Sequence, residues 1–213
     1  MHVKFHRLIG TFFLKFSCEK KNYKIDKIKM VHSSLSSSST IDQQQKQPTA
    51  ISIRNFYNGK SIFLTGGSGF IGKVLIEKLL YSCPEIERIY LLIRPSRDGK
   101  SPQQRLEEEV IKSRVFTFRN KAFDFSKLVA VNGDMTKPRL GLSDSDYQTL
   151  IENVSIVFHS AATVRFHGPL KKFVTQNIHG TESVMKLSRD MKKLQVNFLN
   201  FQKFSLLLTK LNP

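Results

Sequence analysis

The segment that decides the fold reads SIFLTGGSGFIGKVLIEKLLYS and spans residues 61–82. It opens with a short apolar run, passes through closely spaced glycines, and from Phe70 places apolar residues three or four positions apart until Pro84. A short apolar run that ends in glycines is typical of a buried strand, and the wider spacing is typical of an amphipathic helix. The segment therefore predicts a strand over 61–65, a tight turn, and a helix over 70–82.

The turn has the glycine spacing of a dinucleotide-binding loop. Its glycines satisfy both G-x-G-x-x-G and G-x-x-G-x-x-G. Glycines permit the tight turn and let the backbone approach a pyrophosphate, while the helix N-terminus faces the negative charge. A glycine-rich turn that binds nothing is the alternative, but the position between a strand and a helix favours a cofactor loop. The candidate cofactor-binding residues of this loop are Thr65, Gly66, Gly67, Ser68, Gly69, Phe70, Ile71 and Gly72.

The rest of the central region alternates between the same two patterns. Continuous apolar runs predict strands over 89–93, 128–131 and 156–158, and helical spacing predicts helices over 101–115, 143–153 and 168–191. Continuous apolar runs are typical of strands covered on both faces of a parallel sheet. The alternation of strands and helices implies an α/β fold, a doubly wound parallel sheet of the Rossmann NAD(P)-binding type.

The end of the second predicted strand bears on which nicotinamide cofactor would bind. An acidic residue at this place binds the ribose 2′-hydroxyl of NAD, but this sequence has Arg94, with Arg97 close behind. A guanidinium pairs with a 2′-phosphate and gains nothing from a hydroxyl, so the sequence favours NADPH over NADH. The alternative is a surface arginine at a strand end.

Two further strand ends supply candidate cofactor residues. Asp134, which precedes Met135, is placed either to accept a hydrogen bond from the adenine amino group or to begin a turn. The fourth strand runs into small residues, which would let a cofactor lie across the carboxyl edge of the sheet. We expect His159 to be a packed or hydrogen-bonded histidine rather than a catalyst. The candidates at these ends are Asp134, Met135, Ala161, Ala162 and Thr163.

The composition excludes several classes of protein. With 213 residues, 40% hydrophobic and 24% charged, the chain is typical of a globular protein. Its two cysteines, Cys18 and Cys83, cannot form a disulfide framework, and no Cys/His cluster has zinc spacing. We therefore expect no metal site and a reducing compartment. Lys15 interrupts the best apolar run, so we expect no membrane-spanning segment.

The net charge of +17 is concentrated toward the ends of the chain. Residues 1–30 hold eight Lys or Arg and two acids, and residues 196–213 hold two Lys and no acid. A basic chain indicates a nucleic-acid or anionic-membrane partner, or else a solvated basic face with atypical termini. Because the ends carry a disproportionate share, we expect no nucleic-acid partner.

The sequence divides into three parts. Residues 1–55 are expected to be a flexible leader, basic at first and then rich in Ser and Gln. Its beginning is either a targeting segment or sequence upstream of a true start at Met30. Residues 56–195 are expected to be the amino-terminal part of the Rossmann domain. Residues 196–213 are expected to be a divergent tail, either translated non-coding sequence or a genuine helix.

Residues 56–195 resemble the amino-terminal part of the alcohol-forming fatty acyl-CoA reductases. This family is the male-sterility branch of the extended short-chain dehydrogenase/reductases. The stretches that carry the resemblance are FYNGK at 56–60, the glycine loop with the helix after it, LLIRP at 91–95, GD at 133–134, HSAATVRF at 159–166, and Asn177 with Gly180 and Thr181. HSAATVRF and LLIRP are far more diagnostic than the glycine loop. His167 and Gly168 replace a more usual acidic pair.

The resemblance implies NADPH-dependent reduction of a long-chain fatty acyl-CoA, through an aldehyde, to a primary alcohol of lipid metabolism. It implies that the glycine loop and Arg94 bind NADPH, that 161–163 lines the nicotinamide side, and that Asn177 helps to organise the active site. For the full-length protein it implies a carboxyl-terminal membrane-associating segment, and a location on the cytoplasmic face of the endoplasmic reticulum or peroxisome. The fragment itself is expected in the cytoplasm.

The resemblance also implies a Tyr-x-x-x-Lys pair downstream, in which the tyrosine donates a proton to the alkoxide and the lysine lowers the tyrosine pKa. Of the five tyrosines only Tyr23 has a lysine four residues later, Lys27, and this pair precedes the glycine loop. We therefore expect an incomplete Rossmann domain with no activity alone. The alternatives are another extended dehydrogenase or epimerase, a thioester reductase, or a non-catalytic nucleotide-binding protein.

Overall fold

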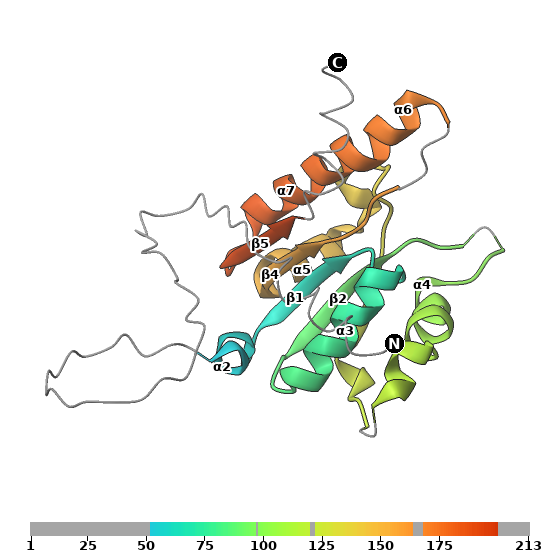
Figure 1. The fold of residues 1–213 in the computed structure, drawn as a ribbon. Coiled ribbons are helices and arrows are strands. Elements are labelled where there is room, and N and C mark those ends of the chain that lie inside the picture. The colour runs from blue at the N-terminus through green and yellow to red at the C-terminus, as the bar shows by residue number, and fades with distance from the viewer. Residues whose placement is uncertain (1–51, 97, 120–121, 164–167, 200–213) are drawn as a thin grey trace, which may run out of the picture.

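The computed structural model describes residues 52–96, 98–119, 122–163 and 168–199. They build a five-stranded parallel sheet with the strand order β3-β2-β1-β4-β5 (Figure 1). The strands are β1 (Ser61–Thr65), β2 (Arg88–Ile93), β3 (Leu128–Asn132), β4 (Val154–His159) and β5 (Val196–Leu199). The chain moves outward from β1 to β3 on one side and returns to pair β4 with the other side of β1. This topology confirms the predicted doubly wound α/β fold.

Helical segments connect the strands. They are α2 (Ile53–Tyr57), α3 (Phe70–Ser82), α4 (Pro102–Arg105), the π-helix η1 (Leu106–Ile111), the 3-10 helices η2 (Arg114–Phe118), η3 (Phe125–Lys127) and η4 (Pro138–Gly141), then α5 (Asp144–Asn153), α6 (Leu170–Phe173), the π-helix η5 (Val174–His179) and α7 (Gly180–Asp190). The predicted helix over 70–82 coincides with α3, and the predicted helix over 143–153 matches α5 with Ser143 as its N-cap.

Two apolar cores lie on opposite faces of the sheet. On one face Ile62 and Leu64 pack against α3 and η1, and on the other Phe63 packs against α5 and α7. Figure 1 shows α3 on one side of the sheet and α5 and α7 on the other. Because successive side chains of a strand point to opposite faces, the fully buried run of β1 serves both cores at once.

The longer helical regions differ in detail from the predictions. In place of one helix over 101–115, α4 runs directly into η1, and the chain then turns at Ser113 before the separate 3-10 helix η2. Ser113 has an extended backbone (φ −71°, ψ 141°), which breaks the helical hydrogen-bond ladder. In place of one regular helix over 168–191, α6, η5 and α7 follow one another with a π-helical segment in the middle.

The ends of the domain also differ from the predicted boundaries. The boundary expected between 55 and 56 falls inside α2. The divergent tail was expected to begin at residue 196, but Val196–Leu199 belongs to the domain: it forms β5 and pairs in parallel with β4. Four residues were too few to show a strand pattern without the neighbouring strand. The rest of the predicted tail and leader, 200–213 and 1–51, lies outside the described residues.

Residues of α7 offer a test of which face of this helix the sheet buries. Leu187 is 2% exposed within the core on the α5 side, whereas Met185 of the same helix is 36% exposed. We expect Leu187→Ala to lower the free energy of unfolding by about 2–5 kcal/mol, because it leaves a cavity. Met185→Ala is the matched control and should cost less than about 1 kcal/mol. Urea unfolding of both variants measures the difference, and equal losses would contradict this packing.

Candidate functional site

The strand ends at the carboxyl edge of the sheet meet around the glycine loop. In the register of the sheet, Thr65 of β1 lies opposite Leu92 of β2 and His159 of β4. The chain leaves β1 toward α3 on one face and reaches β4 from the other face, so β1 and β4 flank the topological switch point. In open α/β sheets ligands bind in the crevice at this place.

The glycine loop is packed so closely that Gly66 and Gly72 have no room for a side chain. Gly66 has φ +78°, and a Cβ there would lie 2.7 Å from the amide nitrogen of Ala161. A Cβ at Gly72 would lie 2.7 Å from the Cα of Gly67 and would also collide with the carbonyl oxygen of Gly66. The Gly69 amide donates to that same carbonyl at 3.0 Å. The predicted tight turn is therefore confirmed, and the glycines also let α3 pack closely against the loop.

The first turn of α3 opens from this loop. No side chain caps its N-terminus at Gly69, and no acidic residue lies in its first turn. Its unpaired amides and the positive end of the helix dipole would therefore favour a phosphate. Phe70 and Ile71 are 68% and 49% exposed, which is unusual for such large apolar side chains. The loop thus combines open backbone donors with an apolar rim.

Arg94 follows β2 directly, and its backbone carbonyl accepts a hydrogen bond from a second arginine, Arg105. The Arg105 Nη1 donates to the carbonyl oxygen of Arg94 at 2.6 Å, while the rest of its guanidinium makes a bidentate pair with Glu109 at 2.7 and 2.8 Å. The hydrogen bond from Arg105 outweighs burial and lowers the pKa of Glu109. Sequence analysis missed Arg105. The spacing of Arg105 and Glu109, four residues apart on a helix, was the available signal.

Asp134 takes the turn geometry that was one of its two predicted roles. Its Oδ1 accepts hydrogen bonds from the amide and the hydroxyl of Thr136, both at 2.8 Å. Burial raises the pKa of the Asp134 carboxyl, but these hydrogen bonds and the charges of Arg94 and Lys137 outweigh it, so the pKa lies below its usual range. The carboxylate is therefore ionised beside Arg94. Its contact with adenine stays a prediction.

Asn177 lies within the π-helix η5 and binds the segment after β4. Its Oδ1 accepts from the amide of Thr163 at 2.9 Å, and its Nδ2 donates to the carbonyl of Thr163 at 3.1 Å. This two-way amide pair holds the backbone of the small-residue segment in one orientation. The amide of Ala161 donates to the Thr65 hydroxyl at 3.3 Å, which ties the other end of the segment to β1.

The structure brings most of the predicted residues to one edge. Gly66 of the glycine loop lies against the backbone of Ala161, and the charge of Arg94 helps to lower the pKa of Asp134. Asn177 forms hydrogen bonds with the backbone of Thr163. Met135 takes a packing role, because it covers Gly180 so closely that a Cβ there would lie 2.8 Å from its Cε. Arg97 and residues 164–167, which include the end of HSAATVRF, lie outside the described residues.

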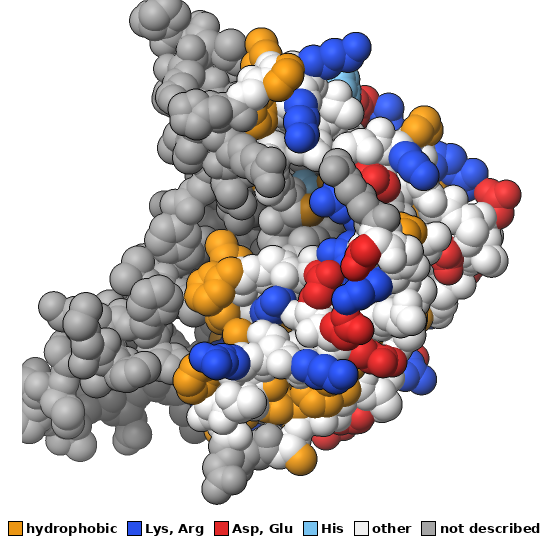
Figure 2. Space-filling view, turned by 90° about the vertical axis from the view of Figure 1, so that its right-hand side faces the viewer, with side chains coloured by type: hydrophobic (Ala, Val, Ile, Leu, Met, Phe, Trp, Pro, Cys, Tyr) orange, Lys and Arg blue, Asp and Glu red, His pale blue; other side chains and the backbone are white. Residues whose placement is uncertain are grey.

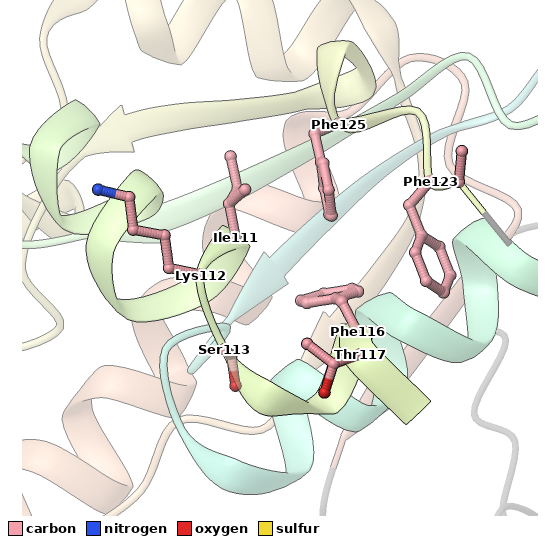
Figure 3. A pocket seen from close by; sticks show the side chains of 8 residues that line it. Ile111, Lys112, Ser113, Phe116, Thr117, Phe123 and Phe125 are labelled. Carbon is pink, nitrogen blue, oxygen red and sulfur yellow. The ribbon is translucent and has the colours of Figure 1, made fainter. Parts of the chain in front are cut away.

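A hollow of about 300 Å³ lies away from this edge, between η1, η2 and η3 (Figure 3). Phe116, Phe123 and Phe125 line it and contact one another edge to face or tilted. Phe125 comes just before β3, so the hollow lies toward the amino edge of the sheet, whereas the glycine loop lies at the carboxyl edge.

Among the described residues, no three His, Cys, Asp or Glu side chains gather as a metal ion would require, and none of the helices has the length and hydropathy of a membrane span.

A parallel sheet with a glycine-rich turn at its switch point defines a dinucleotide-binding domain of the Rossmann type. Residues 64–200 match the model of the NAD-binding male sterility proteins, and the chain belongs to that family. The domain is therefore one that binds a nicotinamide dinucleotide.

Relatives with a similar sequence carry the name fatty acyl-CoA reductase. The chain is 43% identical over 148 residues to fatty acyl-CoA reductase 1 of Homo sapiens, and 42% identical over 142 residues to fatty acyl-CoA reductase wat of Drosophila melanogaster. These matches cover 68% and 66% of this chain but only 28% and 27% of the relatives. The chain thus spans less than a third of the length of these proteins.

Solved structures give the same fold. The terminal R domain of the myxalamid biosynthetic pathway is 28% identical, with a TM-score of 0.52, over 64% of this chain and 33% of that chain. The reductase (R) domain of a non-ribosomal peptide synthetase from Mycobacterium tuberculosis is 26% identical, with a TM-score of 0.50, over 66% of this chain and 32% of that chain. Both are similar to this chain in the arrangement of the sheet and its helices.

Gly72→Ala tests the packing of the loop. The added methyl group would push the backbone of Gly66 and Gly67 away from α3, so we expect binding of a nicotinamide dinucleotide to weaken by about tenfold or more. Isothermal titration calorimetry measures the affinity. Gly59→Ala is the control, because Gly59 lies outside the loop and a Cβ there meets open space, although its own φ is +63°. A Gly72→Ala protein that binds like the Gly59→Ala control would contradict this geometry.

Proposed function

We propose that this chain is the cofactor-binding part of an NADPH-dependent, alcohol-forming fatty acyl-CoA reductase. The observation that carries the proposal is the 43% identity to relatives named fatty acyl-CoA reductase, over a segment that includes the nucleotide edge of the sheet. The identity to the solved reductase domains is lower, at 28% and 26%, so the fatty acyl-CoA reductases are the favoured group over thioester reductases of other pathways.

The preference for NADPH rests on Arg94. An exposed guanidinium follows β2, where the adenosine ribose of a dinucleotide lies in this fold, and Arg105 anchors its backbone. A guanidinium offers paired donors that match a phosphate, and here they would bind the 2′-phosphate. The remaining charge at this edge is mixed, because Asp134 is held ionised nearby. Selectivity therefore depends on the arginine contact and not on a general positive field.

The proposed reaction proceeds in two reductions. The acyl-CoA thioester accepts a hydride and a proton and releases coenzyme A to give an aldehyde, and the aldehyde accepts a second hydride and proton to give the alcohol. NADPH, when bound, supplies each hydride. The described residues would position the cofactor. Amides at the start of α3 would hold its pyrophosphate, and the segment that Asn177 binds would border its nicotinamide.

The proton donor would come from the Tyr-x-x-x-Lys pair, which the 213 residues do not contain after the glycine loop. We further propose that the full-length protein associates with the cytoplasmic face of the endoplasmic reticulum or peroxisome through a carboxyl-terminal segment, as the family resemblance implies.

On the face drawn in Figure 2, Lys and Arg side chains lie among Asp and Glu side chains. This mixed face supports the proposal that no nucleic acid is bound.

Arg94→Ala tests the preference for the 2′-phosphate. Loss of a charged hydrogen-bonding partner should weaken NADPH binding by about 10- to 100-fold and leave NADH binding unchanged. Fluorescence titration with each cofactor measures both. Arg88→Ala removes the same charge from the other end of β2 and should alter neither affinity. An Arg94→Ala protein that keeps its preference for NADPH would show that the 2′-phosphate binds elsewhere.

The 213-residue polypeptide should bind NADPH but form no alcohol from palmitoyl-CoA, because the tyrosine and lysine of the family are not in it. Gas chromatography of the products, alongside the binding titration, checks both halves of this expectation. Appreciable alcohol formation would refute the role given to the missing pair, and absence of NADPH binding would refute the assigned cofactor site.

A further inference from the structure

His159 connects three segments of the site by hydrogen bonds that the family resemblance did not assign. It is the last residue of β4 and is 6% exposed. Its Nδ1 lies 2.6 Å from the Thr65 hydroxyl oxygen, and its Nε2 lies 3.0 Å from the Thr181 hydroxyl oxygen. Thr65 ends β1 and Thr181 belongs to the first turn of α7, so one imidazole bridges the sheet and the helix. This contact confirms the prediction of a hydrogen-bonded histidine.

The neighbours of the ring decide which nitrogen carries the proton. The Thr181 hydroxyl donates to the carbonyl oxygen of Asn177 at 2.6 Å, and a carbonyl oxygen can only accept. A hydroxyl has one proton, so the Thr181 oxygen is left to accept from His159, whose Nε2 must be the donor. In a neutral ring that is protonated on Nε2 the other nitrogen, Nδ1, can only accept, so the Thr65 hydroxyl, which accepts from the amide of Ala161, donates its own proton to Nδ1. All four hydrogen bonds then run in one direction.

This directed chain ends at the residue that holds the small-residue segment. Asn177 accepts the last hydrogen bond with its backbone carbonyl and grips the backbone of Thr163 with its side-chain amide. The segment between Ala161 and Thr163 is thus tied at both ends to the same network. Disturbing the imidazole would release α7 and its preceding π-helical turn from the sheet at the place where Asn177 lies.

We infer that His159 is a positioning residue: as a neutral imidazole protonated on Nε2, it fixes Asn177 and Thr163 relative to the glycine loop, and so shapes the nicotinamide side of the site. The nicotinamide part of this inference rests on the proposed function, whereas the tautomer does not. The imidazole acts through Thr181 and touches no reacting atom in this scheme.

Nitrogen-15 NMR of the histidine ring in the unmodified chain tests the tautomer directly. We expect long-range proton–nitrogen correlations to show a neutral His159 ring with Nε2 protonated, assigned by the loss of its signals in His159→Asn. A ring protonated on Nδ1 alone, or on both nitrogens, would overturn the inference. This measurement needs no ligand.

Thr181→Val tests the consequence for ligand binding. It leaves the Nε2 proton without its acceptor, so we expect NADPH binding to weaken by about tenfold. Binding of adenosine 2′,5′-bisphosphate, which lacks the nicotinamide, should be unchanged. Thr181→Ser keeps the hydroxyl and should restore NADPH binding. Thr149→Val is the matched control, because Thr149 makes the same bond to the carbonyl four residues back, Ser145, on α5 far from the site.

The outcomes separate the two proposals. Equal NADPH affinities for Thr181→Val and Thr149→Val, or an equal loss for both ligands, would overturn the positioning role of His159. A wild-type chain that binds neither ligand would instead count against the proposed function, and the ring measurement would then decide the inference by itself.

Discussion

The site depends on the contact between two stretches of backbone, the turn after β1 and the segment after β4. Gly66 lies so close to the amide of Ala161 that no side chain fits between them, and its positive φ sends the chain toward α3. The same turn packs against Gly72 of α3, where a Cβ would collide with the carbonyl oxygen of Gly66. A Cβ at either position would push the turn after β1 away from its neighbours, which are the segment after β4 and the N-terminus of α3. Because these parts pack against one another and line the crevice, the crevice would change with them.

Around this contact, each element is positioned by groups that do not themselves face the crevice. Arg105 and Glu109 hold the backbone of Arg94 from the side of α4 and η1, so the guanidinium of Arg94 is left exposed at the strand end. Asn177 is placed by the π-helical turn η5, which adds a residue to the helical repeat and turns its amide toward Thr163. An irregular helix is thus part of the way in which the site is built.

The charge of the chain has a different meaning once the residues are placed. The net charge is +17, but the face seen in Figure 2 mixes both signs, and at the edge of the sheet the charge of Arg94 helps to lower the pKa of Asp134. Charge at this edge is therefore local and specific. A single guanidinium with a free exposed surface is better suited to one phosphate than to a polyanion, for which a continuous basic surface is needed.

The sequence by itself determined the first four strands, the helices α3 and α5, the glycine loop and the family, because these depend on local spacing and on short stretches such as LLIRP. Tertiary structure alone decided the rest. The strand over 196–199 is defined by its pairing with β4, and Arg105 and His159 acquire roles only when residues far apart in the chain meet. His159 and Thr65 are 94 positions apart, and no local pattern records a hydrogen bond of that kind.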